Sequence, residues 1–383
     1  MQTTLQHTGI AIAIAAMSLL FSGFNDAVFA DQEAPIPAGD LCTPRMTLRH
    51  PDRCPQTGPG ATLTRWAEMG LYPQTPLPTE DINPNLRYLP FSYLEVNKNG
   101  ISIFPGLDAA RDGNASRSLQ PGFLYLSYVK QLEEGGGVYY QLQSGEVVRG
   151  DKVSQAKPSS FSGLQFTQTP ERPFGWMIGG SYTRLAPGED AWFSNHWLSR
   201  LDVVQVYDVQ EVDGVDWFLI GPGEWIEQKL VGLVWPDPTK PEAVEEERWI
   251  SINLFEQTIA VYENGQLVYA TLASTGRSGA WTKPGSFQVW AKLERDTMTG
   301  GDEDSFYYLE DVPWVMYFDQ ARAIHGTYWH AKFGYQSSRG CVNVTPTDAR
   351  WLFEFAKEGA WVHVWDPSGE TPTDPAKYDA GGA

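Results

Sequence analysis

A cysteine and a histidine sixteen positions apart are the residues of this chain best suited to chemistry. Cys341 lies in the stretch Ser-Arg-Gly-Cys-Val-Asn, and His325 precedes it. A thiol is an effective nucleophile only as its thiolate, and the pKa of a free cysteine is about 8.5. A nearby imidazole, a cation and converging backbone N–H groups each favour the thiolate, and this segment offers all three. The pattern predicts a cysteine acyl-transfer site.

Other interpretations of the same residues remain open. A single cysteine in a β domain is often a small buried hydrophobic residue. His330 could be the base instead of His325, although strand alternation would turn it to the opposite face. His363 is interpreted as structural. A zinc site built from these three histidines and Cys341 matches no standard ligand spacing, so we expect no metal site.

The residues around the motif predict strands and one helix. Alternating apolar positions flank Asn264-Gly265, which is a strong signal for a two-residue hairpin. After the motif, Thr345 can cap a helix whose first turn holds Pro346. Asp348 favours the positive end of that helix, and Gly359 is expected to end it. The C-terminal region is therefore predicted to be mainly β with one helix.

The middle of the chain contains an internal repeat. Residues 140–153 match residues 218–231 at a fixed offset of 78, and both read as strand, Gly-Glu turn and strand. The repeat predicts two small β-barrels, at residues 86–156 and 157–234, which resemble bacterial SH3-like modules. A coincidence of two ordinary hairpins is the alternative.

The remaining segments are expected to be targeting or connecting regions. Residues 1–30 predict an export signal, with an apolar run from Ile10 to Phe21 that is too short for a comfortable membrane span. The alternative is a buried apolar helix. Residues 31–85 and 235–247 are Pro-rich and are predicted to be linkers, and the polar tail 367–383 is predicted to be disordered. We expect no integral membrane span once the signal is removed.

Charge and cysteine content narrow the partners and the compartment. The net charge of −19 argues against a nucleic-acid partner, which would need clustered Lys and Arg. It fits a secreted or cell-envelope protein. In an oxidising compartment Cys42 and Cys54 could close a small loop and leave Cys341 as the free thiol. Alternatively, both of the early cysteines are free.

Residues 248–366 resemble the catalytic domain of YkuD-type L,D-transpeptidases. The family motif is a His, a variable spacer and Ser/Thr-His-Gly-Cys-x-Asn, and the matching residues here are His325, Ser338, Gly340, Cys341 and Asn343. Two further stretches, residues 274–276 and 283–287, also match. The resemblance implies a β-sandwich with one helix, and no cofactor. It covers about a third of the chain.

One residue departs from the family motif. Arg339 stands where most members have His. A guanidinium there would favour the thiolate and could anchor a substrate carboxylate. It cannot act as a base, so all proton transfer would fall to His325.

The resemblance also implies a mechanism on peptidoglycan stem peptides. His325, oriented by the carbonyl of Gly326, deprotonates Cys341, which attacks the amide before the terminal D-alanine of a tetrapeptide stem. Backbone N–H groups around Arg339, Gly340 and Cys341 hold the oxyanion, with Tyr308 as an extra donor. The resulting thioester is attacked by a side-chain amine of a neighbouring stem, which gives a 3→3 cross-link.

The resemblance also indicates residues that would contact substrate. Met298, Tyr308 and Trp329 lie where the family has lid and pocket residues, and Ser338 and Asn343 complete the predicted substrate-binding set. Asn343 is expected to brace the loop more than to touch substrate. Alternatives with the same site are an L,D-carboxypeptidase or a protein-to-wall attachment enzyme. A non-catalytic wall-binding protein is the alternative from another class.

Overall fold

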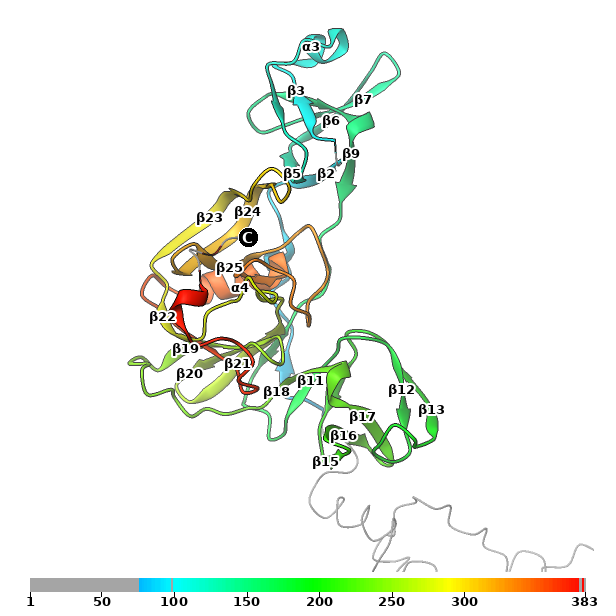
Figure 1. Cartoon of the computed structure of the whole chain (residues 1–383), viewed down its shortest axis with the longest axis vertical. Coiled ribbons are helices and arrows are strands. Elements are labelled where there is room, and N and C mark those ends of the chain that lie inside the picture. Colours follow the sequence, from blue (N-terminus) through cyan, green and yellow to red (C-terminus); the bar gives the residue numbers. More distant parts are fainter. Residues whose placement is uncertain (1–75, 98, 379–380, 382–383) are drawn as a thin grey trace, which may run out of the picture. The chain divides into compact units, whose positions relative to one another are not determined.

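The computed structural model describes residues 76–97, 99–378 and 381, and these residues form a mainly β fold (Figure 1). The predicted export signal, most of the linker 31–85, Cys42 and Cys54 lie outside the described residues. Among the residues that are described, no helix is long and apolar enough to cross a membrane.

Two seven-stranded sheets carry the C-terminal region. The first has the order β1-β10-β21-β20-β19-β27-β22, with the bounds Thr79–Glu80, Leu164–Phe166, Gln266–Leu272, Thr258–Glu263, Arg248–Asn253, Trp361–Trp365 and Gly285–Gln288. The second follows the order β26-β25-β24-β5-β2-β9, with β23 paired to β24; the bounds are Val342–Val344, Arg322–Gly326, Tyr307–Asp319, Phe123–Tyr128, Ser92–Val96, Val153–Ala156 and, for β23, Ala291–Gly300.

The main core lies between these two sheets. It joins Ile250 and Val261 of the first sheet to Met316 and Ile324 of the second, and Leu352 of helix α4 (Pro346–Phe355) packs into the same cluster. The predicted sandwich with one helix near its C-terminus is confirmed. The turn between β20 and β21 is also as predicted, since Asn264 and Gly265 both have positive φ, 52° and 74°, as a type I′ turn requires.

Helix α4 begins as predicted and ends earlier than predicted. The hydroxyl of Thr345 accepts a hydrogen bond from the backbone N–H of Asp348 at 3.1 Å, and Pro346 occupies the first turn. The C-cap is Ala356. Gly359 lies beyond this C-cap, in a turn, and its backbone N–H donates to the carbonyl of Val289. The helix therefore ends before Gly359.

The two repeated stretches adopt the same series of elements. In the first, β7 (Gly137–Gln141) and β8 (Val147–Arg149) lead through the 3-10 turn η2 (Gly150–Lys152) into β9. In the second, β16 (Val215–Gly221) and β17 (Glu224–Glu227) lead through η3 (Gln228–Leu230) into β18 (Val231–Val234). The repeat therefore extends to structure, while the likeness to SH3-like modules stays a prediction.

The other elements complete the parts of the chain that hold these two stretches, residues 86–156 and 157–234, which are called here the first and the second repeat. Around the first repeat lie β3 (Ile101–Ile103), α3 (Leu107–Asp112), β4 (Arg117–Leu119) and β6 (Lys130–Glu134). Around the second lie β11 (Phe174–Met177), β12 (Ser181–Arg184), β13 (Phe193–Leu198), β14 (Val203–Gln205) and β15 (Asp208–Val212). The short helix α3 was not predicted from the sequence.

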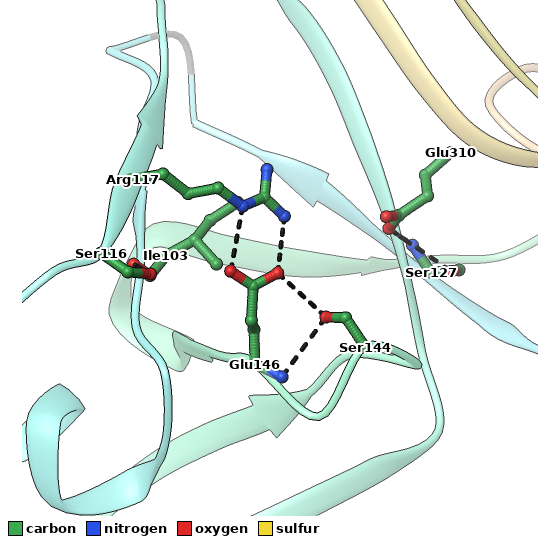
Figure 2. Close-up of polar contacts among 7 residues, drawn as sticks. All are labelled: Ile103, Ser116, Arg117, Ser127, Ser144, Glu146 and Glu310. Carbon is green, nitrogen blue, oxygen red and sulfur yellow. Dashed lines mark hydrogen bonds and ion pairs between the residues drawn. The ribbon is translucent and has the colours of Figure 1, made fainter.

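Strand pairing joins the first repeat directly to the C-terminal region. β5 pairs in parallel with β24, with Phe123 opposite Tyr307 and Tyr125 opposite Leu309. Ser127 of β5 donates its backbone N–H to the carboxylate of Glu310 at 2.9 Å (Figure 2). The first predicted module therefore shares a sheet with the region that it precedes.

Segments predicted to be linker or tail also pack on the folded chain. The 3-10 turn η1 (Pro84–Arg87) contacts α4, and the carbonyl of Asn85 accepts a hydrogen bond from Arg350 at 2.6 Å. The described part of the predicted tail, residues 367–378, contains turns and the 3-10 turn η4 (Pro375–Lys377). The ring of Tyr378 lies 5.4 Å from the guanidinium of Arg322.

Asp348 is expected to stabilise the fold by holding the segment that precedes β10. Its buried carboxylate accepts hydrogen bonds from the N–H of Gly163 at 2.9 Å and from the hydroxyls of Tyr269 and Thr271 at 2.7 and 2.6 Å. Asp348→Ala leaves these donors unpaired, so we expect the free energy of unfolding to fall by about 3 kcal/mol. Denaturant titration measures this. The exposed Glu358→Ala on the turn after α4 is the control, and an equal effect of both would contradict the assignment.

Candidate active site

Strands β25 and β26 place His325 and Cys341 on one face. The two strands are parallel, with Ile324 opposite Val342 and His325 opposite Asn343. Because side chains alternate along a strand, Cys341, which directly precedes β26, shares a face with Ala323 and His325. The backbone N–H of Ala323 indeed lies 3.4 Å from the Cys341 Sγ.

The ring of His325 is fully buried and has one free nitrogen. Its Nδ1 lies 3.4 Å from the carbonyl oxygen of Gly326, while Nε2 has no hydrogen-bond partner in the described part of the chain. Burial is the main cause that lowers the pKa of His325 to about 4; the contact with Gly326 raises it, and the nearby His330 lowers it further. At neutral pH the imidazole is therefore uncharged, and Nε2 carries the lone pair of a general base.

The thiol of Cys341 is also fully buried and uncharged. Desolvation raises the pKa of Cys341 to about 12, although the bond from Ala323 and the charge of Arg322 both lower it. Within residues 76–97 and 99–378, no hydrogen bond joins the thiol to His325. The resting site therefore holds a neutral thiol and a neutral imidazole, and not a thiolate–imidazolium pair.

Gly340 and Ser338 shape the turn that carries the thiol. Gly340 has a φ of 120°, and a Cβ there would lie 3.1 Å from the Arg322 Nε, so both backbone and space require glycine. The Ser338 hydroxyl donates to the carbonyl of Cys341 at 2.6 Å and accepts from the N–H of Gly340 at 3.1 Å. The N–H of Gly340, predicted to hold the oxyanion, is therefore already engaged. Those of Arg339 and Cys341 remain as candidate donors.

The stretch 274–276, which matched the family in sequence, braces this turn. The backbones of Ser274 and Asn343 exchange two hydrogen bonds, at 2.8 and 2.9 Å, and the carbonyl of Thr275 accepts the N–H of Ser338 at 3.0 Å. These bonds tie the thiol loop to the end of β21. The loop is thus fixed by the other sheet of the sandwich.

Asn343 and His330 form a pair beside the site. The Asn343 side-chain amide lies 3.0 Å from Nε2 of His330, whose Nδ1 accepts the N–H of Lys332 at 3.1 Å. Burial, and secondarily the charge of Lys332, lower the pKa of His330 to about 4. Because both of its nitrogens have partners, His330 is poorly placed to be the base. The contacts of Asn343 with His330 and with the backbone of Ser274 are those of a residue that braces the loop.

The two arginines near the thiol have different surroundings. Arg339 donates to the carbonyl of Ser305 at 2.9 Å, and its guanidinium lies 4.6 Å from the centre of the Tyr307 ring. The cation that lowers the pKa of Cys341 is instead Arg322, buried and 3.1 Å from Asp319. Arg322 belongs to no sequence motif; the turn between β24 and β25 brings it to the site.

The side chains around the thiol form an aromatic cluster, called here the thiol cluster. Its buried members are Tyr93, Tyr125, Met298, Tyr307, Leu309, Val312, Val315, Ala323, Tyr328 and Cys341, with Trp329 and Tyr317 packed against them. Of the predicted pocket residues, Met298 belongs to the cluster that holds Cys341, and Trp329 packs against this cluster. Tyr308 does not, because alternation along β24 turns it into the cluster around Leu94 and Leu124.

Part of the thiol cluster comes from the first repeat and covers the site. Tyr93 of β2 stacks on Tyr328 with ring centres 3.5 Å apart, and its hydroxyl donates to the carbonyl of Asp311 at 3.0 Å. The hydroxyl of Tyr125 lies 3.5 Å from the carbonyl of Trp329, whose ring is 5.6 Å from that of His325. No motif signalled these tyrosines. Elsewhere in the first repeat, Arg117 of β4 donates two hydrogen bonds to the carboxylate of Glu146, at 3.0 and 2.7 Å (Figure 2).

The remaining sequence candidates lie elsewhere. His363 of β27 contacts the Ser286 hydroxyl at 2.9 Å, in the first sheet. Among the described residues, no group of three or more His, Cys, Asp or Glu is placed to hold a metal ion.

Comparisons with known proteins address the C-terminal third. The model of the YkuD family, the L,D-transpeptidase catalytic domain, matches residues 247–364. None of the curated proteins compared matches the chain. Solved structures similar to it include the catalytic domain of an Enterococcus faecium L,D-transpeptidase, at 28% identity over 32% of this chain and 98% of that one, with a TM-score of 0.29.

Two further structures are also similar to this chain. An L,D-transpeptidase from Stackebrandtia nassauensis is 25% identical over 36% of this chain and 63% of its own, with a TM-score of 0.27. Mycobacterium tuberculosis L,D-transpeptidase 1 is 22% identical over 31% and 62%, also with a TM-score of 0.27. The family model is the finding that counts here: residues 247–364, the C-terminal third of the chain, match the L,D-transpeptidase catalytic domain of the YkuD family.

Proposed function

We propose that this chain is an exported peptidoglycan L,D-transpeptidase that uses Cys341 as its nucleophile. The observation that carries the proposal is the free, buried Nε2 of His325 on the same strand face as Cys341, inside a domain of this family. The predicted export signal and the net charge of −19 support action in the cell envelope.

The neutral resting pair suggests when the proton moves. With the pKa of His325 at about 4 and that of Cys341 at about 12, a full thiolate is costly before substrate binds. Proton transfer from the thiol to Nε2 would therefore accompany attack on the stem amide. Nδ1–H directed at the carbonyl of Gly326 keeps Nε2 as the acceptor, and the imidazolium then protonates the departing D-alanine amine.

Substrate must displace part of the thiol cluster. Because Cys341 has no exposed surface, an acyl group on Sγ needs space that side chains now fill. The tyrosines from the first repeat are the part of the cluster that lies outside the catalytic domain. The N–H groups of Arg339 and Cys341 then support the oxyanion, and an amine from a neighbouring stem resolves the thioester into a 3→3 cross-link.

The first test is mass spectrometry of the mature protein mixed with a disaccharide-tetrapeptide, beside Cys341→Ala. We expect D-alanine release and a 3→3 dimer from the wild type and neither from the variant, because the nucleophile is absent. Equal thermal unfolding of both proteins controls for folding. Tripeptide without dimer would indicate a carboxypeptidase, and no product with no acyl-enzyme would favour a non-catalytic wall-binding protein.

The two histidines of the site give a matched pair. His325→Gln should lower the acylation rate by about 10²- to 10⁴-fold, since it removes the base. His330→Gln should lower it by less than about tenfold, because His330 only braces the loop through Asn343. Single-turnover acylation measures both rates. Equal losses, or a larger loss at His330, would contradict the assignment of the base.

The pKa of the thiol predicts how it reacts without substrate. With a pKa of about 12, the thiolate fraction rises about tenfold per pH unit, so alkylation of Cys341 by iodoacetamide should climb between about pH 7 and 10 without a plateau. Peptide mass spectrometry resolves Cys341 from the other cysteines. In denaturant the same peptide should level off above about pH 8.5. A plateau near neutral pH in the native protein would show a resting thiolate.

A further inference from the structure

A pocket of about 310 Å³ lies on the outer face of the first sheet. Its lining includes Ser251 and Asn253 of β19 and His363 and Trp365 of β27. The two strands pair in parallel, with Ser251 opposite His363 and Asn253 opposite Trp365. Because side chains alternate along a strand, these four point away from the main core, which holds the residues between them. The volume is within the range of small-molecule sites.

The segment between β18 and β19 forms another wall of the pocket. This segment, residues 235–247, includes Trp235 and Asp237, which both line the pocket. The backbone N–H of Asp237 donates to the hydroxyl of Tyr262 at 3.2 Å. The ring of Tyr262 in turn stacks on that of Trp249, with ring centres 4.9 Å apart. Hydrogen bonding and stacking therefore hold this wall against the sheet.

Two tryptophans of the pocket have open ring surface. Trp235 is 51% exposed and Trp365 is 37% exposed. The indole N–H of Trp365 donates to the hydroxyl of Ser251 at 3.0 Å, which fixes the edge of that ring. Single exposed apolar side chains are ordinary on a protein surface. Two tryptophans in one pocket instead offer flat apolar faces to a ligand that has an apolar face of its own.

Polar groups of the pocket have unused hydrogen-bonding capacity. Nδ1 of His363 lies 2.9 Å from the Ser286 hydroxyl, while its Nε2 has no hydrogen bond within residues 76–97 and 99–378. In the same part of the chain, the side-chain nitrogen of Asn253 and the hydroxyl of Thr239 are also without a partner, and Asp237 uses one carboxylate oxygen only. Donors and acceptors therefore lie in the same pocket as the aromatic faces.

The charge of the pocket narrows the ligand class. Asp237 is the one carboxylate among the lining residues, and these residues include no Lys or Arg. Burial lowers the pKa of His363, so its ring is uncharged at neutral pH. A phosphate or carboxylate ligand would need charged donors that the pocket lacks. The pocket therefore suits a neutral ligand.

Two neutral ligands could use aromatic faces, and the free polar groups favour one of them. A proline-rich peptide fits aromatic grooves, but proline has no N–H and no hydroxyl, so most of the donors and acceptors of the pocket would stay unpaired. A pyranose ring has an apolar C–H face for stacking and a rim of hydroxyls. Each hydroxyl both donates and accepts, which matches the mixed set of free groups.

We propose that this pocket binds a neutral saccharide unit, which stacks its C–H face on Trp235 and Trp365. Its hydroxyls bond to Asn253, His363 and Asp237. The inference goes beyond the proposed transpeptidase function and does not depend on it, because the pocket lies across the main core from β25 and β26, on the opposite face of the first sheet. Neutral saccharide units occur in the glycan of a cell wall and in other polysaccharides.

The first experiment is isothermal titration calorimetry of the mature protein with three tetrasaccharides. Chitotetraose and cellotetraose are neutral, and tetragalacturonate is anionic. We expect the neutral probes to bind and the anionic one to bind several-fold more weakly, a difference that Asp237→Asn should narrow. Preference for chitotetraose would identify an N-acetylated glycan as the source, and preference for cellotetraose an unmodified one. Binding of a proline-rich peptide instead, or of no saccharide up to about 10 mM, would overturn the proposal.

Variants locate the binding on the protein. Trp235→Leu should weaken saccharide binding by about three- to tenfold, whereas Trp235→Phe, which keeps an aromatic face, should weaken it less. His363→Phe should also cost about three- to tenfold, because it removes a hydrogen-bonding nitrogen. Trp290→Ala, at a tryptophan that is 59% exposed and lies outside the pocket, is the control and should match the wild type.

A second readout separates stacking from a loss of folding. In NMR spectra of the saccharide, its C–H protons should shift upfield with the wild type and much less with Trp235→Leu, because an aromatic ring current acts only on a stacked ring. Equal thermal unfolding of all variants controls for folding. If a saccharide binds but Trp235→Leu and His363→Phe behave as Trp290→Ala does, the binding lies elsewhere and the pocket assignment is wrong.

Discussion

The parallel pairing of β5 with β24 is the constraint on which the rest of the site depends. Three register pairs, from Phe123 opposite Tyr307 to Tyr125 opposite Leu309, extend the sheet that holds β24, β25 and β26 into the first repeat. Since side chains alternate along both strands, this register turns Tyr125 and Tyr307 into the thiol cluster and Tyr308 into the opposite one. A shift by one residue would exchange these faces. The cover over the thiol and a pocket that Arg339 lines both follow from one short stretch of backbone hydrogen bonds.

Burial by this cover explains the electrostatics of the site. Desolvation penalises the charged form of each group, so it lowers the pKa of His325 and raises that of Cys341. The buried cation Arg322 opposes this effect at the thiol but does not overcome it. A dry, neutral pair protects the thiol from oxidation and alkylation, which both proceed through the thiolate. The same dryness strengthens the interactions that stabilise the oxyanion once substrate has opened the site.

The sequence could predict the features that depend on local chemistry. The hairpin at Asn264-Gly265, the cap at Thr345 and the motif around Cys341 each follow from neighbours in the chain. The predicted end of α4 was wrong. Gly359 is the kind of residue that commonly ends a helix, but the C-cap in the structure is Ala356. Tyr93, Tyr125 and Arg322 could not be found, since a strand register and a turn bring them to the thiol, and no local pattern encodes either. The hydrogen bond from Arg339 to the carbonyl of Ser305 could not be predicted for the same reason.

The position of Arg339 gives this departure from the family motif a physical consequence. A histidine there could exchange protons with the site, whereas a guanidinium stays charged and offers a fixed set of donors. Tyr307 supports one face of Arg339, and the carbonyl of Ser305 fixes one of its ends. Its orientation is thus set by the C-terminal region, while Glu95, an exposed carboxylate of the first repeat, lines the same pocket. The surroundings of Arg339 therefore depend on the β5–β24 register as much as the cover of the thiol does, because both need the first repeat to lie against β24.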